Sequence, residues 1–115
     1  MGTSSGGWVA VMAALTAEVA ELEGDLGNPE QSSAVQAVVD LFGPTNFLEM
    51  DTHRLPDGME HDPPDSPESQ LMGFAIQTDP VVVHAADPSR YVTAASPPAW
   101  ISHGMQDPLV PYQPK

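Results

Sequence analysis

The chain has 115 residues, of which 16 are Asp or Glu and three are Lys or Arg, so its formal net charge at pH 7 is −13. So acidic a chain repels the phosphates of nucleic acid and of anionic lipid, and we expect neither nucleic acid nor a membrane among its partners. The absence of cysteine excludes disulfides, thiol catalysis and cysteine-bound metal. Thirteen of the 115 residues are proline, more than twice the usual share of about 5 %. This predicts that much of the chain is turn or irregular connection.

The first predicted element is a helix over residues 8–22, WVAVMAALTAEVAEL. Ala, Leu, Met and Glu are favourable helix formers. The first half of the run is apolar nearly all round, which predicts burial on more than one side. Acidic residues gather at its C-terminal end, where they oppose the helix dipole. Gly24 and Gly27 then supply stop signals.

Two short apolar runs predict strands. Residues 35–42, VQAVVDLF, are rich in β-branched and aromatic side chains and end at Gly43-Pro44. This pattern is typical of a parallel strand covered on both faces. Residues 97–103, PPAWISH, predict a second strand, and the loop that follows it carries Asp107.

The stretch over residues 44–70 holds seven acidic residues and several prolines, which predict irregular structure. Within and after it, Ser66 and Pro67 favour a short helix through Leu71, and Asp79 is the expected cap of another over 79–86. Helix, strand, irregular insertion and strand follow one another as in α/β proteins. Because two strands cannot form a stable doubly covered sheet, the expected architecture is incomplete.

The motif that carries chemistry is Gly2-x-Ser4-x-Gly6, which fits a nucleophile elbow. In such an elbow a serine lies on a sharp turn between a strand and a helix, and glycines two residues away on each side let neighbouring backbone approach. The N–H groups of the following helix can then stabilise an oxyanion. A predicted helix does follow, but the motif alone is also compatible with a flexible Gly/Ser-rich start.

The longer pattern resembles bacterial esterases of the α/β-hydrolase superfamily, in the group of feruloyl-esterase-like and carboxylesterase/lipase enzymes. The similarity runs in order over nearly the whole chain. Its segments are Gly2-Thr3-Ser4-Ser5-Gly6-Gly7, Glu23-Gly24-Asp25-Leu26-Gly27-Asn28, residues 35–47, Asp65-Ser66-Pro67-Glu68-Ser69 to Gly73, residues 86–92, and Pro97-Pro98-Ala99-Trp100-Ile101-Ser102-His103-Gly104 with Asp107 and Val110-Pro111.

The resemblance implies a role for three residues. Ser4 matches the nucleophile, the backbone N–H of Ser5 matches an oxyanion donor, and Asp107 matches the acid that orients a histidine. In this fold the order along the chain is serine, acid, histidine. No histidine follows Asp107 here. We therefore expect a C-terminal-half fragment of an esterase, inactive by itself because the catalytic histidine and the N-terminal strands are absent.

The resemblance also implies an incomplete three-layer α/β-hydrolase fold within one partial domain. Its predicted divisions are 1–43 for elbow, helix and strand, 44–92 for an acidic Pro-rich cap-like insertion, and 93–115 for strand and acid loop. The expected partner is a small-molecule ester, with no cofactor and no metal. The alternative is a non-enzymatic acidic interaction module of hydrolase ancestry.

The histidines and large apolar residues have plainer interpretations. His103 at the end of a strand is expected to be structural, and His84 to be a surface or packing residue. His53 and His61 are expected in a solvated acidic loop, with metal binding as the minor alternative. A final group is expected in the core rather than in a pocket wall: Trp8, Phe47, Met50, Leu71 and Met72.

Overall fold

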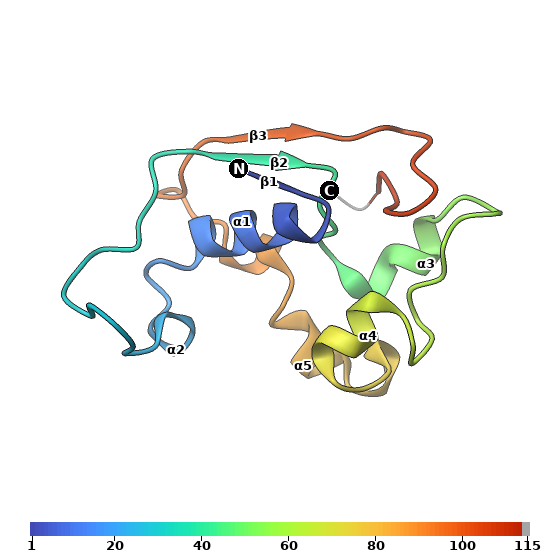
Figure 1. Ribbon diagram of the computed structural model, residues 1–115, viewed down its shortest axis with the longest axis horizontal. Coiled ribbons are helices and arrows are strands. Elements are labelled where there is room, and N and C mark those ends of the chain that lie inside the picture. Colours follow the sequence, from blue (N-terminus) through green and yellow to red (C-terminus); the bar gives the residue numbers. More distant parts are fainter. Residues whose placement is uncertain (114–115) are drawn as a thin grey trace.

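Three parallel strands organise the chain: β1 (Gly2–Thr3), β2 (Val38–Leu41) and β3 (Ala99–Ser102). In the computed structural model, which describes residues 1–113, they form one sheet in the order β1-β2-β3 (Figure 1). The register aligns Thr3 with Leu41 and Leu41 with Ser102, so all three strands end at the same edge.

The strands predicted over 35–42 and 97–103 are confirmed with shorter bounds. The expectation of only two strands is wrong, because β1 is a third. Two residues, Gly2 and Thr3, are too few to show the alternation by which strands are recognised in a sequence.

Helix α1 (Ser5–Leu15) lies against β1 and β2 on one face of the sheet (Figure 1). It ends earlier than predicted: the Thr16 hydroxyl donates to the Met12 carbonyl at 2.8 Å, and a separate single turn, α2 (Ala20–Glu23), follows. The break has an electrostatic reason. It moves Glu21 from the C-terminal end of one helix, which repels acids, to the first turn of another, which attracts them.

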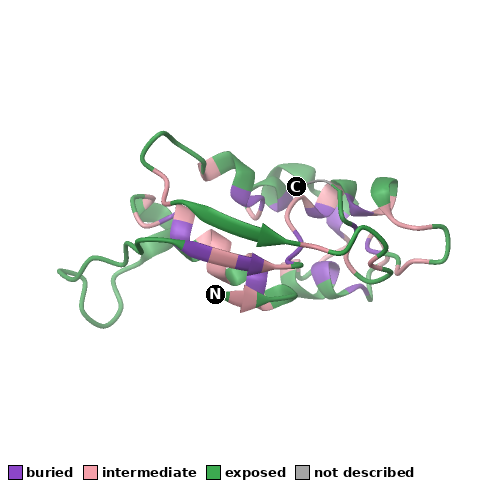
Figure 2. Cartoon of the chain, turned by 90° about the horizontal axis from the view of Figure 1, so that it is seen from above, coloured by how far each residue is buried: buried purple, intermediate pink, exposed green. Residues whose placement is uncertain are grey.

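The two faces of the sheet differ in burial. On β2, Val38 and Asp40 are buried toward α1, whereas Val39 and Leu41 are only partly covered. All four residues of β3 are exposed, so this strand is uncovered on both faces, and Trp100, beside Val39 on the face away from α1, is 69 % exposed. Figure 2 looks onto this open face. The expectation that the strand over residues 35–42 is covered on both faces is therefore wrong for residues 1–113.

The segment between β2 and β3 folds into short helices beneath the sheet (Figure 1). Their bounds are Phe47–Glu49 (η1), Met50–His53 (α3), Pro67–Met72 (α4), Ile76–Thr78 (η2), Pro80–His84 (α5) and Pro88–Tyr91 (η3). The helices predicted after Ser66 and Asp79 are confirmed, and both residues accept the expected cap hydrogen bonds. The turn of helix over residues 47–53 was not predicted.

A small apolar core joins these helices. Phe47, Met50, Ile76 and Val83 are buried in it, and Trp8 of α1 packs against it. The Trp8 indole also donates to the Ala86 carbonyl at 2.8 Å, which ties α1 to the short helices.

The core assignment made from sequence is confirmed for four of its five residues. Phe47 and Met50 are buried, and Trp8 and Met72 pack against the core. Leu71 is 57 % exposed, so its assignment to the core is wrong.

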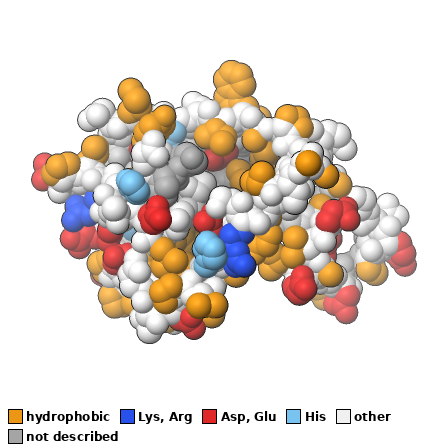
Figure 3. Space-filling view, turned by 180° about the vertical axis from the view of Figure 1, so that it is seen from behind, with side chains coloured by type: hydrophobic (Ala, Val, Ile, Leu, Met, Phe, Trp, Pro, Cys, Tyr) orange, Lys and Arg blue, Asp and Glu red, His pale blue; other side chains and the backbone are white. Residues whose placement is uncertain are grey.

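Exposed acids gather at the end of the molecule that carries α2 (Figure 3). This group comprises Glu18, Glu21, Glu23, Asp25 and Glu30.

No helix within residues 1–113 is long and apolar enough to cross a bilayer.

Close packing of α1 on β2 depends on two facing glycines. A Cβ atom on Gly7 would overlap the Asp40 carboxylate and lie 2.9 Å from the Gly43 Cα, and one on Gly43 would lie 2.8 Å from the Trp8 nitrogen. The buried Asp40 carboxylate accepts the Gly43 N–H at 2.8 Å, which secures the turn after β2. Gly6, in contrast, has open space where its Cβ would be.

We therefore predict opposite effects for two neighbouring substitutions. Gly7→Ala should lower the free energy of unfolding by about 1–3 kcal/mol, because the methyl group overpacks the junction. Gly6→Ala should raise it by about 0.5–1 kcal/mol, because alanine restricts the unfolded chain and favours the helix. Urea unfolding followed by tryptophan fluorescence measures both, and equal effects would contradict the assignment of Gly7 as the packing glycine.

Candidate active site

Ser4 lies at the turn between β1 and α1. Its backbone has φ 53° and ψ −129°, a conformation that costs a non-glycine residue on the order of 1–3 kcal/mol. Its N–H donates to the Leu41 carbonyl at 3.0 Å, and its carbonyl accepts from Gly7 at 2.8 Å. These bonds to β2 and α1 hold the strained residue in place, and Ser4 is exposed.

Only one of the two glycines in the motif is required for close approach. A Cβ on Gly2 would overlap the carbonyl of Gly6, so the strand can meet the helix only with glycine there. The expectation that Gly6 also permits close approach is wrong for the described residues, because its Cβ position is open. Gly7, one residue further on, has that role.

Ser5 begins α1. The first N–H groups of a helix have no acceptor within the helix and carry its positive dipole end. The Ser5 N–H belongs to this group and lies next to Ser4, so the backbone around Ser4 can attract a negative oxygen.

Asp107 lies in the loop that follows β3. Its Oδ1 accepts the N–H groups of Leu109 and Val110 at 2.8 and 3.0 Å, and its Oδ2 lies 3.4 Å from His103 Nε2. The side chain is 20 % exposed. We call residues 107–110 the acid loop.

Ser4 and the acid loop follow strand ends at the same edge of the sheet. One strand, β2, separates β1 from β3, so the two strand ends are about 10 Å apart at a spacing of about 4.8 Å per strand.

His103 has the contacts of a packing residue. Its side chain is 1 % exposed, and its Nε2 lies 2.8 Å from the Val110 carbonyl. Its ring also meets Tyr112 edge-on, with centroids 6.1 Å apart. The His103 ring, which follows directly after β3, therefore contacts the acid loop at both of its ends, Asp107 and Val110.

His61 is not in a solvated loop, and that expectation is wrong. Its side chain is 1 % exposed, and its Nδ1 lies 2.9 Å from Glu68 Oε2, whose side chain is 8 % exposed. Burial alone would lower the pKa of His61. The hydrogen bond and charge of Glu68, the charge of Asp51 and the Leu109 backbone outweigh burial and raise this pKa above 6.5.

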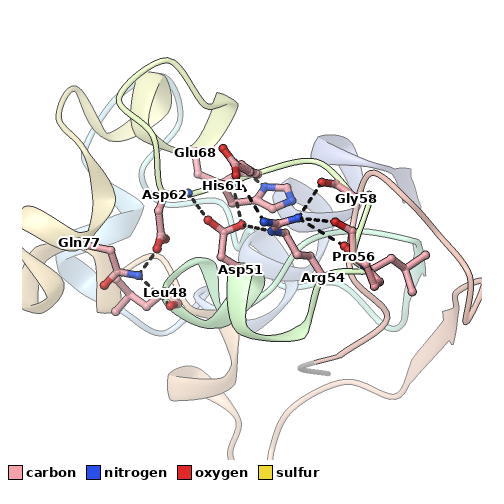
Figure 4. A network of polar contacts seen from close by, with 11 residues as sticks. Leu48, Asp51, Arg54, Pro56, Gly58, His61, Asp62, Glu68 and Gln77 are labelled. Carbon is pink, nitrogen blue, oxygen red and sulfur yellow. Dashed lines mark hydrogen bonds and ion pairs between the residues drawn. The ribbon is translucent and has the colours of Figure 1, made fainter.

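A polar network surrounds this pair (Figure 4). Both carboxylate oxygens of Asp51 accept backbone N–H groups, from His61 at 2.8 Å and from Asp62 at 2.9 Å. Arg54 Nε lies 3.7 Å from Asp51. The network places charged groups of α3, α4 and the loop between them in a single cluster.

The remaining histidines are at the surface. His53 is exposed and lies 3.7 Å from Glu49, and His84 is exposed on α5, as expected for a surface residue. Among residues 1–113, no group of three or more His, Asp or Glu side chains is arranged to hold a metal ion.

Sequence reasoning missed the His61–Glu68 pair. Glu68 was placed correctly in the first turn of a short helix, but the pair forms only because the proline-rich loop folds back over that helix. The spacing of seven residues across several prolines carries no signal for such a contact.

The raised pKa of His61 predicts how stability depends on pH. A group whose pKa is higher in the folded than in the unfolded chain stabilises the fold below pH 6.5, and that contribution is lost as the pH rises through the folded value. The free energy of unfolding should therefore fall as the pH is raised from 6 toward 9. In Glu68→Gln this fall should be smaller, whereas the surface variant His84→Gln should retain it. Equal pH dependence in Glu68→Gln and the unchanged chain would contradict the assignment.

Comparison with known proteins gives the family. The model of the BD-FAE family matches residues 1–114. A bifunctional GH43-CE protein from Bacteroides eggerthii is 31 % identical, with a TM-score of 0.81 over 95 % of this chain and 15 % of that one. A truncated form of a carbohydrate esterase from gut microbiota is 32 % identical, with a TM-score of 0.79 over 96 % of this chain and 41 % of that one.

No curated protein matches the chain. The chain spans less than half the length of either solved relative. The family match nevertheless extends over nearly every residue, and both relatives share more than 30 % of the aligned sequence. The chain therefore belongs to the BD-FAE family of esterase-like α/β-hydrolase domains.

Proposed function

We propose that this chain carries the nucleophile and the acid of a serine-dependent carboxylic-ester hydrolase. Ser4 is the nucleophile and Asp107 is the acid. The observation that supports this most is the conformation of Ser4, an exposed serine held at positive φ between a strand and a helix. Asp107 lies beyond the end of β3, at the same edge of the sheet.

The chemistry follows from these positions. The Ser4 hydroxyl attacks an ester carbonyl while a histidine takes its proton, and the carboxylate of Asp107 orients that histidine. The Ser5 N–H, at the start of α1, stabilises the oxyanion that forms. An acyl-serine results, the alcohol leaves with the proton, and water then releases the acid.

The proposal needs a base that these 115 residues do not offer. No histidine follows Asp107, and His103 is buried with its Nε2 engaged by the acid loop. We propose that the base and a second oxyanion donor come from polypeptide outside these residues. The chain alone is then an inactive fragment, and the predicted divisions at 1–43, 44–92 and 93–115 are parts of one hydrolase domain.

The substrate class is a small-molecule ester, and an ester of a carbohydrate is the form favoured by the relatives. One of them is described as a carbohydrate esterase. The acidic surface supports a neutral substrate rather than a polyanion, because like charges repel at the −13 net charge of this chain.

A chimera tests the proposal directly. Residues 1–113 replace the aligned segment of the carbohydrate esterase relative, and p-nitrophenyl acetate hydrolysis is measured for the chimera and for the chain alone. The chimera should be active and the chain inactive. Ser4→Ala and Asp107→Asn should each lower kcat by roughly 10⁴-fold, because triad members act as a unit.

Two variants serve as matched controls. Ser32→Ala and Asp25→Asn change an exposed serine and an exposed aspartate near α2, and both should keep full activity. A folded, active chimera that is indifferent to Ser4→Ala would refute the proposal and favour the acidic interaction module instead.

A further inference from the structure

The acid loop rests on the proline-rich segment that precedes α4. The Met59 N–H donates to the Pro108 carbonyl at 2.8 Å. A Cβ on Gly58 would lie 3.2 Å from the same carbonyl, so the two backbones are in close contact. Val110, at the end of the loop, packs against the apolar core formed by the short helices. The loop is therefore held by residues 58–59 and by the core of the short helices, as well as by its connection to β3.

The supporting segment is itself fixed by charged groups. The Arg54 guanidinium donates to the carbonyls of Leu55, Pro56 and Gly58 at 3.2–3.4 Å. Asp51 accepts the N–H groups of His61 and Asp62, at the other end of the segment. These bonds replace the regular hydrogen bonding that prolines prevent, so the segment has one defined path under the loop.

His61 is the member of this network that also faces the acid loop. His61 follows by two residues Met59, whose N–H bonds the loop at Pro108, and the Leu109 backbone is among the groups that raise the pKa of His61. The ring is anchored on α4 by Glu68 at 2.9 Å, and its side chain is 1 % exposed. Glu68 thus sets the position of a buried ring at the end of the segment that supports the loop.

We propose that His61 and Glu68 form a positioning pair that holds Asp107 in place by supporting the acid loop through Met59 and Leu109. The significance of this for catalysis rests on the proposed function, because there Asp107 is the acid. His61 is not a catalytic residue, because its 1 % exposed side chain cannot reach substrate. It is distinct from His103, whose Nε2 lies 2.8 Å from the Val110 carbonyl of the same loop.

Amide hydrogen exchange of the whole chain, resolved by NMR, tests the proposal without any assay of activity. The Leu109 and Val110 amides donate to Asp107 Oδ1 and therefore report its position. In Glu68→Gln, which keeps the shape but removes the charge, these two amides and that of Met59 should exchange at least about tenfold faster. The amides of Val38 and Phe42 donate to the carbonyls of Pro98 and Ser102 at the ends of the sheet strands. Their exchange rates should be unchanged.

The matched control is His84→Gln, which changes an exposed histidine on α5 and should alter none of these rates. Equal acceleration of loop and sheet amides in Glu68→Gln would show a general loss of stability and overturn the positioning role. Unchanged loop amides in a folded Glu68→Gln would overturn it as well.

A second measurement needs no variant. The charged groups near the two buried histidines differ: Glu68 and Asp51 face His61, Arg54 faces Asp51, and Asp107 faces His103. The NMR signals of each histidine ring are therefore followed separately as the pH is raised. The Met59 and Leu109 amide shifts should change with the midpoint of the His61 ring. A flat profile, or a midpoint that matches only His103, would overturn the proposal even if Glu68→Gln does not fold.

The active chimera then separates this proposal from the proposed function. Glu68→Gln should lower kcat at least about tenfold and leave KM within about twofold, because the acid is displaced while the substrate contacts remain. If the chimera is indifferent to Ser4→Ala, the proposed function fails, and the exchange rates alone decide whether the pair positions the loop. An active, Ser4-dependent chimera with normal kcat in Glu68→Gln would refute only the positioning role.

Discussion

The parallel register of β1, β2 and β3 is the constraint on which the rest of the structure depends. Parallel strands all end at one edge, and in this chain the segments after β1 and β3 carry Ser4 and Asp107. The strained turn at Ser4 is held by hydrogen bonds to β2 and α1. Without the alignment of Thr3 with Leu41, neither the turn nor its relation to the acid loop would exist.

Buried polar groups secure the parts that the small apolar core cannot. Asp40 is 1 % exposed and anchors the turn after β2, and His61 with Glu68 anchors the irregular segment. Removing such groups from water is costly unless they are paired. Their pairing therefore gives the loops around the site defined positions, because the core cluster found within residues 1–113 contains four buried residues.

The open face of the sheet contrasts with this ordered edge. Trp100 is exposed beside the partly covered Val39 on the face away from α1, and Ile101 is exposed on the α1 side of the same strand. Exposed apolar patches of this kind mark surfaces that pack against further polypeptide. The proposed function gives this surface a role, because it requires residues from outside the chain to complete the hydrolase domain.

Much of the candidate site followed from local sequence, and the rest did not. The Gly-x-Ser-x-Gly pattern and the apolar runs indicated a turn, a helix and two strands, because these depend on residues adjacent in the chain. The caps at Ser66 and Asp79 were predicted for the same reason. Tertiary structure alone decided that Gly7 rather than Gly6 is the packing glycine and that His61 is buried on Glu68. Both depend on contacts between separate segments of the chain, which turns and proline-rich connections bring together without any periodic pattern.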